Sequence, residues 1–192
     1  MDEETDGRLA RGAARRTLLL ETAIWIVADR GSGSLTHRAV AEAAQVSVAS
    51  VTYHFPSIVD LRRETFEHAG SSIGLELAGL VLAASTRIED TPEICAAFAV
   101  RLVVERRVVT AAMFELIVAA AHDEELRPLV AMYNDRLTDL LTPYEGDHRN
   151  AQIVGAAIQG LLIVHLASPY GVDASALGEA VADLIRRYHH NN

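Results

Sequence analysis

Residues 35–57 read LTHRAVAEAAQVSVASVTYHFPS, and this stretch decides how the N-terminal part of the chain folds. Its apolar residues recur at intervals of three and four, which is the period of a helix. Thr36 and Ser47 each stand directly before such a run. A hydroxyl at that place can accept a hydrogen bond from a free backbone N–H of the first helical turn. The pattern therefore predicts two short capped helices that are joined by Gln45 and Val46.

The second of these segments, residues 48–54, is ambiguous by propensity alone. It is rich in β-branched and aromatic residues, which are common in strands. Two observations favour a helix. Val48, Val51 and Phe55 are spaced by three and four residues, and no partner strand is recognisable nearby.

Two short helices in this order are typical of a helix-turn-helix, in which the second helix enters the major groove of DNA. Spacing alone is equally compatible with a structural helical hairpin. Helix N-termini present free N–H groups to phosphate oxygens, and small or hydroxyl side chains can approach base edges closely. The residues predicted to contact DNA are Thr36, His37, Arg38, Ser47, Val48, Ala49, Ser50, Thr52, Tyr53 and His54.

The rest of the chain shows helical periodicity and no convincing strand or internal repeat. Gly31 and Gly33 are expected to end the first helix, because glycine tolerates the left-handed conformation that closes a helix. The sequence predicts an all-α fold of about nine helices. Outside residues 35–57 these helices are expected near 8–30, 58–82, 93–107, 110–121, 123–141, 151–167 and 173–189.

The charge of the chain is unevenly distributed. The formal net charge is −9, from 17 basic and 26 acidic residues. Residues 7–55 hold six arginines against three acids, whereas residues 56–192 hold eleven arginines against nineteen acids. Because phosphate contacts depend on the local field, a small basic segment before a large acidic body remains compatible with DNA binding.

The pattern of residues 9–69 resembles the TetR family of bacterial transcriptional repressors, down to Tyr-x-Phe at 53–55 and Ser-x-x-Asp-Leu at 57–61. Two departures stand out. Gln45 occupies the turn position where the family usually has glycine, so a non-glycine residue is expected to adopt positive φ there, at about 1 kcal/mol. Ile58 replaces a lysine that usually reaches a phosphate.

The resemblance implies a two-domain helical protein, with a DNA-binding domain at 1–56 and a ligand-binding and dimerisation domain at 57–192. It implies a homodimeric repressor that a small-molecule effector releases from a palindromic operator in double-stranded DNA. Two other interpretations stay open. One is an activator or adaptor with weak or no DNA binding, and the other is a small-molecule-binding helical bundle or an enzyme built on one.

The family usually dimerises through its last two long helices. Residues 151–172 carry no formal charge and are apolar on every side, as expected for a helix between its own core and a twofold partner. A membrane span is disfavoured by the polar residues, the glycines and Pro169 in this stretch. The residues predicted at the dimer interface are Gly155, Ala156, Gly160, Leu177, Val181 and Leu184.

A ligand pocket is implied by the resemblance, and the sequence locates it poorly. Glu115 interrupts the apolar run 110–121, where a charge needs a partner. Arg101, Arg107 and a cationic ligand are the options, and an internal ion pair is the structural alternative to a pocket. The candidates for the pocket are Phe98, Arg101, Phe114, Glu115, Tyr133, Gln159 and His165.

Cys95 is the only cysteine, so an intrachain disulfide and a cysteine-rich zinc site are excluded. A reducing, cytoplasmic location fits this composition, and the acidic start of the chain lacks the pattern of a signal peptide. No phosphate-binding loop, nucleophile elbow or repeated Glu-x-x-His motif is present. The sequence therefore predicts no metal, no cofactor and no enzymatic activity.

Overall fold

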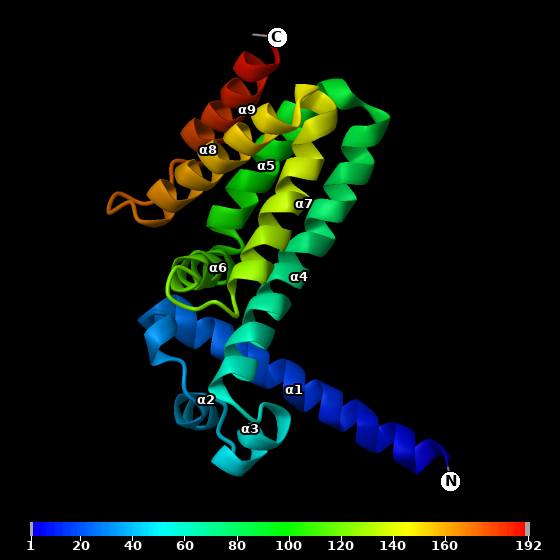
Figure 1. Ribbon diagram of the computed structural model, residues 1–192, viewed down its shortest axis with the longest axis vertical. Helices are drawn as coiled ribbons and strands as arrows, with labels where there is room; N and C mark the ends of the chain where they lie inside the picture. Colours follow the sequence, from blue (N-terminus) through cyan, green and yellow to red (C-terminus); the bar gives the residue numbers. More distant parts are fainter. Residues whose placement is uncertain (1, 191–192) are drawn as a thin grey trace.

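The computed structural model describes residues 2–190, which form nine α-helices, two short 3-10 helices and no strand (Figure 1). The predicted all-α fold is confirmed. The helices are α1 (Asp2–Arg30), η1 (Ser32–Ser34), α2 (His37–Ala43), α3 (Val48–His54), α4 (Ile58–Thr86), η2 (Ile88–Asp90), α5 (Thr91–Val104), α6 (Arg107–Ala119), α7 (Arg127–Glu145), α8 (His148–Leu166) and α9 (Ala174–His190).

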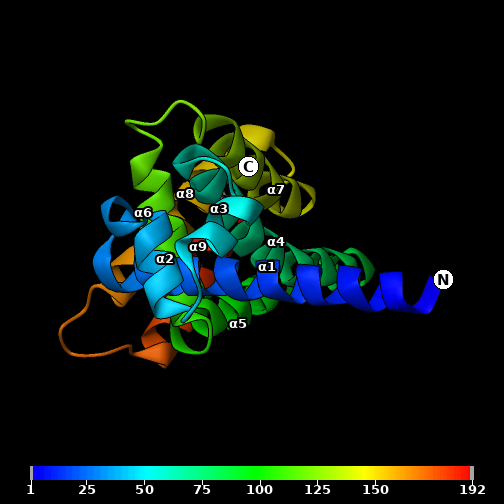
Figure 2. The ribbon, with the colours of Figure 1, turned by 90° about the horizontal axis from the view of Figure 1, so that it is seen from below.

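The helices form two regions that α4 connects (Figure 1). The head consists of α1, α2, α3 and the first turns of α4, and its core includes Val27, Val40, Val51 and Phe55, all fully buried. The body consists of α5–α9 and the remainder of α4. The first half of α1 extends away from both regions, as Figures 1 and 2 show.

The predicted caps of the two short helices are present. The Thr36 hydroxyl oxygen accepts from the backbone N–H of Ala39 at 3.0 Å, and that of Ser47 accepts from Ser50 N–H at 3.1 Å. Residues 48–54 are thus a helix and not a strand. The tertiary setting overrides their β propensity, because Val51 lies on the face that is buried in the head.

Helix α6 is apolar from residue 111 to its end except for Glu115, yet it is not surrounded on every side. It lies at the junction of head and body and packs against α1, α4 and α5. Ala112, Met113 and Leu116 are buried, but the side chain of Val118 is 62% exposed on the opposite face. An apolar composition therefore does not mean burial on every side of this helix.

Three residues predicted at the dimer interface lie instead in the core of the chain itself. Leu177 and Val181 are fully buried where α9 packs along α5. Gly155 faces α7, and a Cβ atom added there would lie 3.3 Å from Leu137 Cδ2. Leu184 is half-buried against the same core. Leu177 and Val181 of α9 and Gly155 of α8 are therefore covered within one protomer, which corrects these three assignments, whereas Leu184 stays a prediction.

Ala156 and Gly160, by contrast, are exposed on the outer face of α8. This face stays available to a second copy. Among residues 2–190, no helix has the length and apolarity needed to cross a membrane.

Replacing Leu177 tests the correction for α9. Leu177→Ala should lower the free energy of unfolding by about 2–5 kcal/mol, because it leaves a cavity between α9 and α5. Urea denaturation measures this, and the loss should not depend on protein concentration. The control Leu75→Ala, at a side chain that is 78% exposed on α4, should change stability by about 0.5 kcal/mol or less. An unfolding free energy unaltered by Leu177→Ala, together with weaker self-association, would contradict the core assignment.

Candidate functional site

The outward face of α3 is the first candidate site. Val51 and Phe55 anchor the opposite face in the core of the head. Val48 is 44% exposed and Tyr53 is 82% exposed, and Ala49 and Thr52 lie exposed between them. The face therefore presents small apolar groups, a methyl and one phenol, which are side chains able to meet base edges in a major groove.

The hydroxyl groups of the head divide into two kinds. Thr52 Oγ1 donates back to the carbonyls of Val48 and Ala49, at 3.2 Å each, so its methyl group is the part presented outward. Thr36 and Ser47 use their oxygens as caps, which leaves the hydroxyl protons available as donors to a phosphate oxygen. Ser50 is half-buried behind them, where its backbone N–H donates to the Ser47 cap.

His37 and His54 are half-buried, and both stay predictions as DNA contacts. His37 Nε2 lies 2.7 Å from the carbonyl oxygen of Phe55, so this nitrogen carries the proton and donates it. The bond ties the start of α2 to the end of α3. His54 is half-buried, with its ring edge-on to Tyr53 at 5.2 Å between centroids. The His37 bond supports the geometry of the helix-turn-helix, and the exposed Tyr53 reaches outward.

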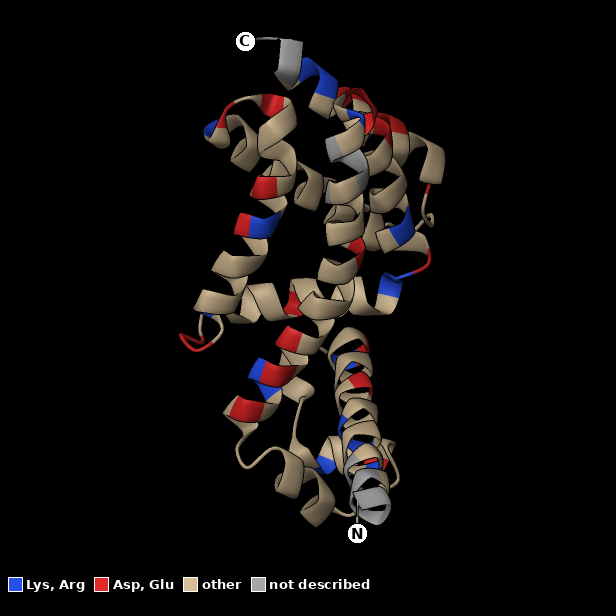
Figure 3. Ribbon diagram, turned by 90° about the vertical axis from the view of Figure 1, so that its right-hand side faces the viewer, with Lys and Arg blue, Asp and Glu red and all other residues tan. Residues whose placement is uncertain are grey.

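The head carries unpaired positive charge on two helices. Arg38 on α2 and Arg11 and Arg15 on α1 are exposed, and none of them forms an ion pair with any described residue. Figure 3 shows basic residues distributed along α1. Arg16 is engaged differently, because it pairs with Glu64 of α4 and lies 5.4 Å from the centroid of the Phe55 ring.

The turn between α2 and α3 takes the strained form that the sequence predicts. Gln45 has φ 55°, and it is the only described non-glycine residue in the left-handed region. Gly31, at the end of α1, has φ 79° as expected, whereas Gly33 lies within η1 without positive φ. The chain thus places glutamine where the turn favours glycine.

The start of α4 is fixed by a reciprocal cap. Ser57 Oγ accepts from Asp60 N–H at 3.0 Å, and the Asp60 carboxylate accepts from Ser57 N–H at 3.1 Å and from Ser57 Oγ at 2.7 Å. These hydrogen bonds from Ser57 lower the pKa of Asp60 below its ordinary value. Ile58, the other departure, is half-buried against the core of the head. It contributes packing where a lysine would contribute charge.

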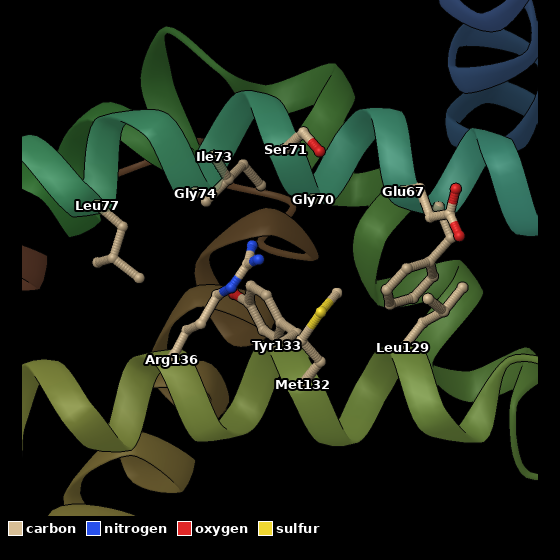
Figure 4. Close-up of a pocket in the computed structure, with 11 residues that line it drawn as sticks. Glu67, Gly70, Ser71, Ile73, Gly74, Leu77, Leu129, Met132, Tyr133 and Arg136 are labelled. Atoms are coloured by element: carbon tan, nitrogen blue, oxygen red, sulfur yellow. The ribbon is translucent and has the colours of Figure 1, made fainter.

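The second candidate site is a pair of adjacent cavities in the body, an outer part and an inner part, which share lining residues. The outer part lies between α4 and α7 (Figure 4). The inner part extends towards α5 and α8, and Ile73, Leu77 and Tyr133 line both. The other lining residues include Phe66, Glu67, Ser71, Gly74, Leu129, Met132 and Arg136 outside, and Cys95, Phe98, Leu102, Leu137, Leu140, Ile158 and Gln159 inside.

Three of the seven predicted pocket residues, Phe98, Tyr133 and Gln159, line this cavity. The other four lie elsewhere. Arg101 pairs with Glu76 and Glu105, and Phe114 is half-buried against the core on α6.

Glu115 is exposed, and its carboxylate accepts from the backbone N–H of Ser32 at 3.4 Å. It pairs with neither Arg101 nor Arg107, whose guanidinium donates to the carbonyl of Leu166. His165 Nδ1 lies 2.8 Å from the Leu161 carbonyl of its own helix. Each of these four residues thus has contacts outside the cavity. The hydrogen-bond donor to Glu115 is a backbone N–H of the head, 83 positions away in the sequence.

The interior of the cavity holds few polar groups. Burial raises the pKa of the Tyr133 hydroxyl and of the Cys95 thiol to about 12 each, so both are neutral at physiological pH. The Tyr133 hydroxyl has no hydrogen-bond partner among the described residues. The Gln159 amide donates to Asn134 Oδ1 at 3.1 Å. A mainly apolar cavity with a small number of polar groups is typical of a small-molecule site.

Comparison with known proteins gives two family matches. Residues 19–65 match the model described as bacterial regulatory proteins of the tetR family. Residues 87–188 match the tetracyclin repressor-like C-terminal domain. Together these matches cover the helix-turn-helix and nearly all of helices α5–α9.

Individual relatives agree with the family matches. The HTH-type transcriptional regulator BetI of Brucella anthropi is 30% identical over 176 residues, which cover 88% of each chain. The Brucella melitensis biotype 2 protein of the same name is 28% identical over 179 residues, 89% of each chain.

Solved structures include a TetR family member of Streptomyces coelicolor A3, SCO1917, with TM-score 0.72, 26% identity and coverage of 88% of this chain and 97% of that one. The multidrug binding protein EbrR in complex with malachite green superimposes with TM-score 0.72 and 25% identity, covering 88% of this chain and 97% of that one.

Replacing Gln45 tests the strain in the turn. Gln45→Gly should raise the free energy of unfolding by about 1 kcal/mol, because glycine adopts positive φ without the steric penalty of a side chain. Chemical denaturation measures the change. The matched control Ala43→Gly, at an exposed helical position two residues earlier, should lower it by about 0.5–1 kcal/mol. An equal loss of unfolding free energy in both variants would show that the turn carries no such strain.

Proposed function

Because the chain belongs to the TetR family of bacterial transcriptional regulators, we propose that it is a homodimeric repressor whose operator is released when a small molecule occupies the cavity of the body. The proposal that the chain binds DNA is supported by the exposed face of α3, which has Tyr53 at its end. We keep the division into a DNA-binding domain at 1–56 and a ligand-binding and dimerisation domain at 57–192, acting in the cytoplasm and without a catalytic step.

On DNA, α3 lies in the major groove and α2 crosses the backbone. Val48, Ala49 and Thr52 approach the bases, while the free hydroxyl protons of Thr36 and Ser47 meet phosphates. Arg38 adds a charge-assisted phosphate contact. The unpaired arginines of α1 support this orientation because they increase the positive field of the head. His37 contributes as a positioning residue through its bond to Phe55.

The dimer forms through the outer face of α8. Ile153 is 41% exposed, Ile163 is 42% and Val164 is 65%, and the exposed Ala156 and Gly160 lie between them. This apolar, uncharged strip on one helix is well suited to a twofold partner, since small residues allow the two helices to approach closely. A twofold dimer presents two heads to a palindromic operator, in successive major grooves about one helical turn apart.

The response to ligand depends on α4, which belongs to both regions. Its first turns carry Leu61 in the core of the head, and later turns carry Phe66, Ile73 and Leu77 on the wall of the cavity. A ligand that binds one orientation of α4 more tightly than another shifts the spacing of the two heads. The structures of EbrR in complex with imidazole and with malachite green support a small-molecule ligand for this chain.

The function is tested by selecting bound duplexes from a randomised DNA pool and titrating salt on the selected sequence. An enriched palindrome whose affinity falls steeply with salt is expected, because phosphate contacts release counterions. Reporter expression from a promoter that carries this sequence then distinguishes repression from activation. Absence of enrichment with a folded sample would contradict the proposal.

Two substitutions on the head test the DNA-binding surface. Arg38→Ala should weaken operator binding and reduce the slope of log affinity against log salt by about 1, because one phosphate contact is lost. Tyr53→Ala should weaken operator binding by about tenfold. Fluorescence anisotropy with labelled duplex measures both effects. Arg87→Ala, a control at the far end of the body, should leave binding unchanged. Wild-type affinity in both head variants would contradict the assigned surface.

Matched substitutions at two exposed glycines test the dimer face. Neither Gly160 on α8 nor Gly79 on α4 has an atom within 4 Å of the place where a Cβ would stand. Gly160→Arg should convert the dimer to monomer at micromolar concentration, because it places a charge in the apolar strip. Gly79→Arg should leave the dimer intact. Sedimentation equilibrium measures both, and a Gly160→Arg variant that remains dimeric would move the interface elsewhere.

A further inference from the structure

Arg136 lies where the cavity opens between α4 and α7. Its side chain extends from α7 across the cavity towards Gly74 of α4 (Figure 4). A Cβ atom added at Gly74 would lie 3.1 Å from Arg136 Nη1. The guanidinium therefore lies close against the place that a side chain at residue 74 would occupy, and it faces both the cavity and the groove outside it.

This guanidinium has no ion-pair partner among residues 2–190, although most arginines of the body do. Glu67, the acidic residue on the outer lining, pairs with Arg63 at 3.4 Å. Asp139 lines the external groove one turn further along α7 but lies beyond ion-pair distance. The guanidinium at the mouth of the cavity is thus not engaged in a direct ion pair with any described residue.

The inner part of the cavity carries no charge. Its polar groups are the Tyr133 hydroxyl, the neutral thiol of Cys95 and the Gln159 amide, which Asn134 already engages. An ion taken into this part would lose its hydration without gaining a counter-charge. A ligand that fits both parts has its charged end at the mouth and an apolar portion inside.

We propose that the effector is an amphipathic anion, a carboxylate on an apolar chain or ring, with its carboxylate on Arg136 and its apolar portion between Phe66, Tyr133 and Phe98. This inference rests on the proposed function, since it names the chemical class of the effector. A guanidinium binds a carboxylate through two parallel N–H donors, which gives both orientation and affinity. Because Arg136 reaches over α4, the bound anion contacts the helix that leads to the head.

The test compares three probes that share one apolar chain. Decanoate, decanol and decyltrimethylammonium are titrated into the full-length protein by calorimetry, below the concentrations at which they form micelles. Decanoate is expected to bind with one molecule per protomer, decanol about tenfold more weakly and the ammonium without measurable heat. Loss of a charged hydrogen-bonding partner corresponds to about a tenfold change in affinity.

Two variants with a matched control assign the binding to Arg136. Arg136→Gln should weaken decanoate about tenfold and leave decanol unchanged. Gly74→Val should weaken decanoate severalfold, because its side chain fills the space of the guanidinium. Gly79→Val places the same residue on the same helix with open surroundings and should match the wild type.

Tighter binding of the ammonium, equal decanoate affinity in Arg136→Gln, or no binding of any probe would each overturn the inference. Anisotropy with the selected duplex is measured on the same samples. A protein that binds its operator but prefers the cation contradicts the ligand class alone. A protein that binds decanoate through Arg136 but binds no duplex contradicts the proposed function and leaves the ligand class in place.

Discussion

The burial of Phe55 is the constraint on which the head depends. Its ring is fully buried, its carbonyl accepts the proton of His37, and the guanidinium of Arg16 lies over the ring. The same guanidinium forms an ion pair with Glu64 of α4. Phe55, at the end of α3, therefore contacts α1 and α2 directly and is linked to α4 through Arg16, and this junction determines which face of α3 is left outside. The chemistry of that face follows from packing on the other side.

Between head and body the chain has few polar connections. The Arg62 guanidinium lies 3.6 Å from the Asp123 carboxylate, and Glu115 accepts from Ser32 N–H. The remaining contacts are the packing of α6 on α1 and the continuous helix α4. The packing of α6 on α1 is extensive, so this contact contributes most to the relative orientation of head and body.

Features that depend on neighbours in the sequence were predictable. Thr36, Ser47 and the positive φ of Gln45 follow from local rules of capping and turn geometry, and the structure has all three. Features that depend on which helix faces pack against each other were not predictable. The stripe with Leu177 reads the same whether it faces α5 or a second protomer, and only the placement of α9 decides. Likewise, the sequence could not show that Arg136 lacks an ion-pair partner, because this depends on which residues α4 places opposite it.

Trp25 is the only tryptophan of the chain, and Arg30 lies 5.6 Å from the centroid of its ring on α1. The indole is 45% exposed beside α2 and belongs to neither part of the cavity. The emission of this fluorophore consequently reports on the surroundings of the head and not on direct contact with a ligand. The protein thus contains an intrinsic optical probe of the head that is separate from both parts of the cavity, without any label.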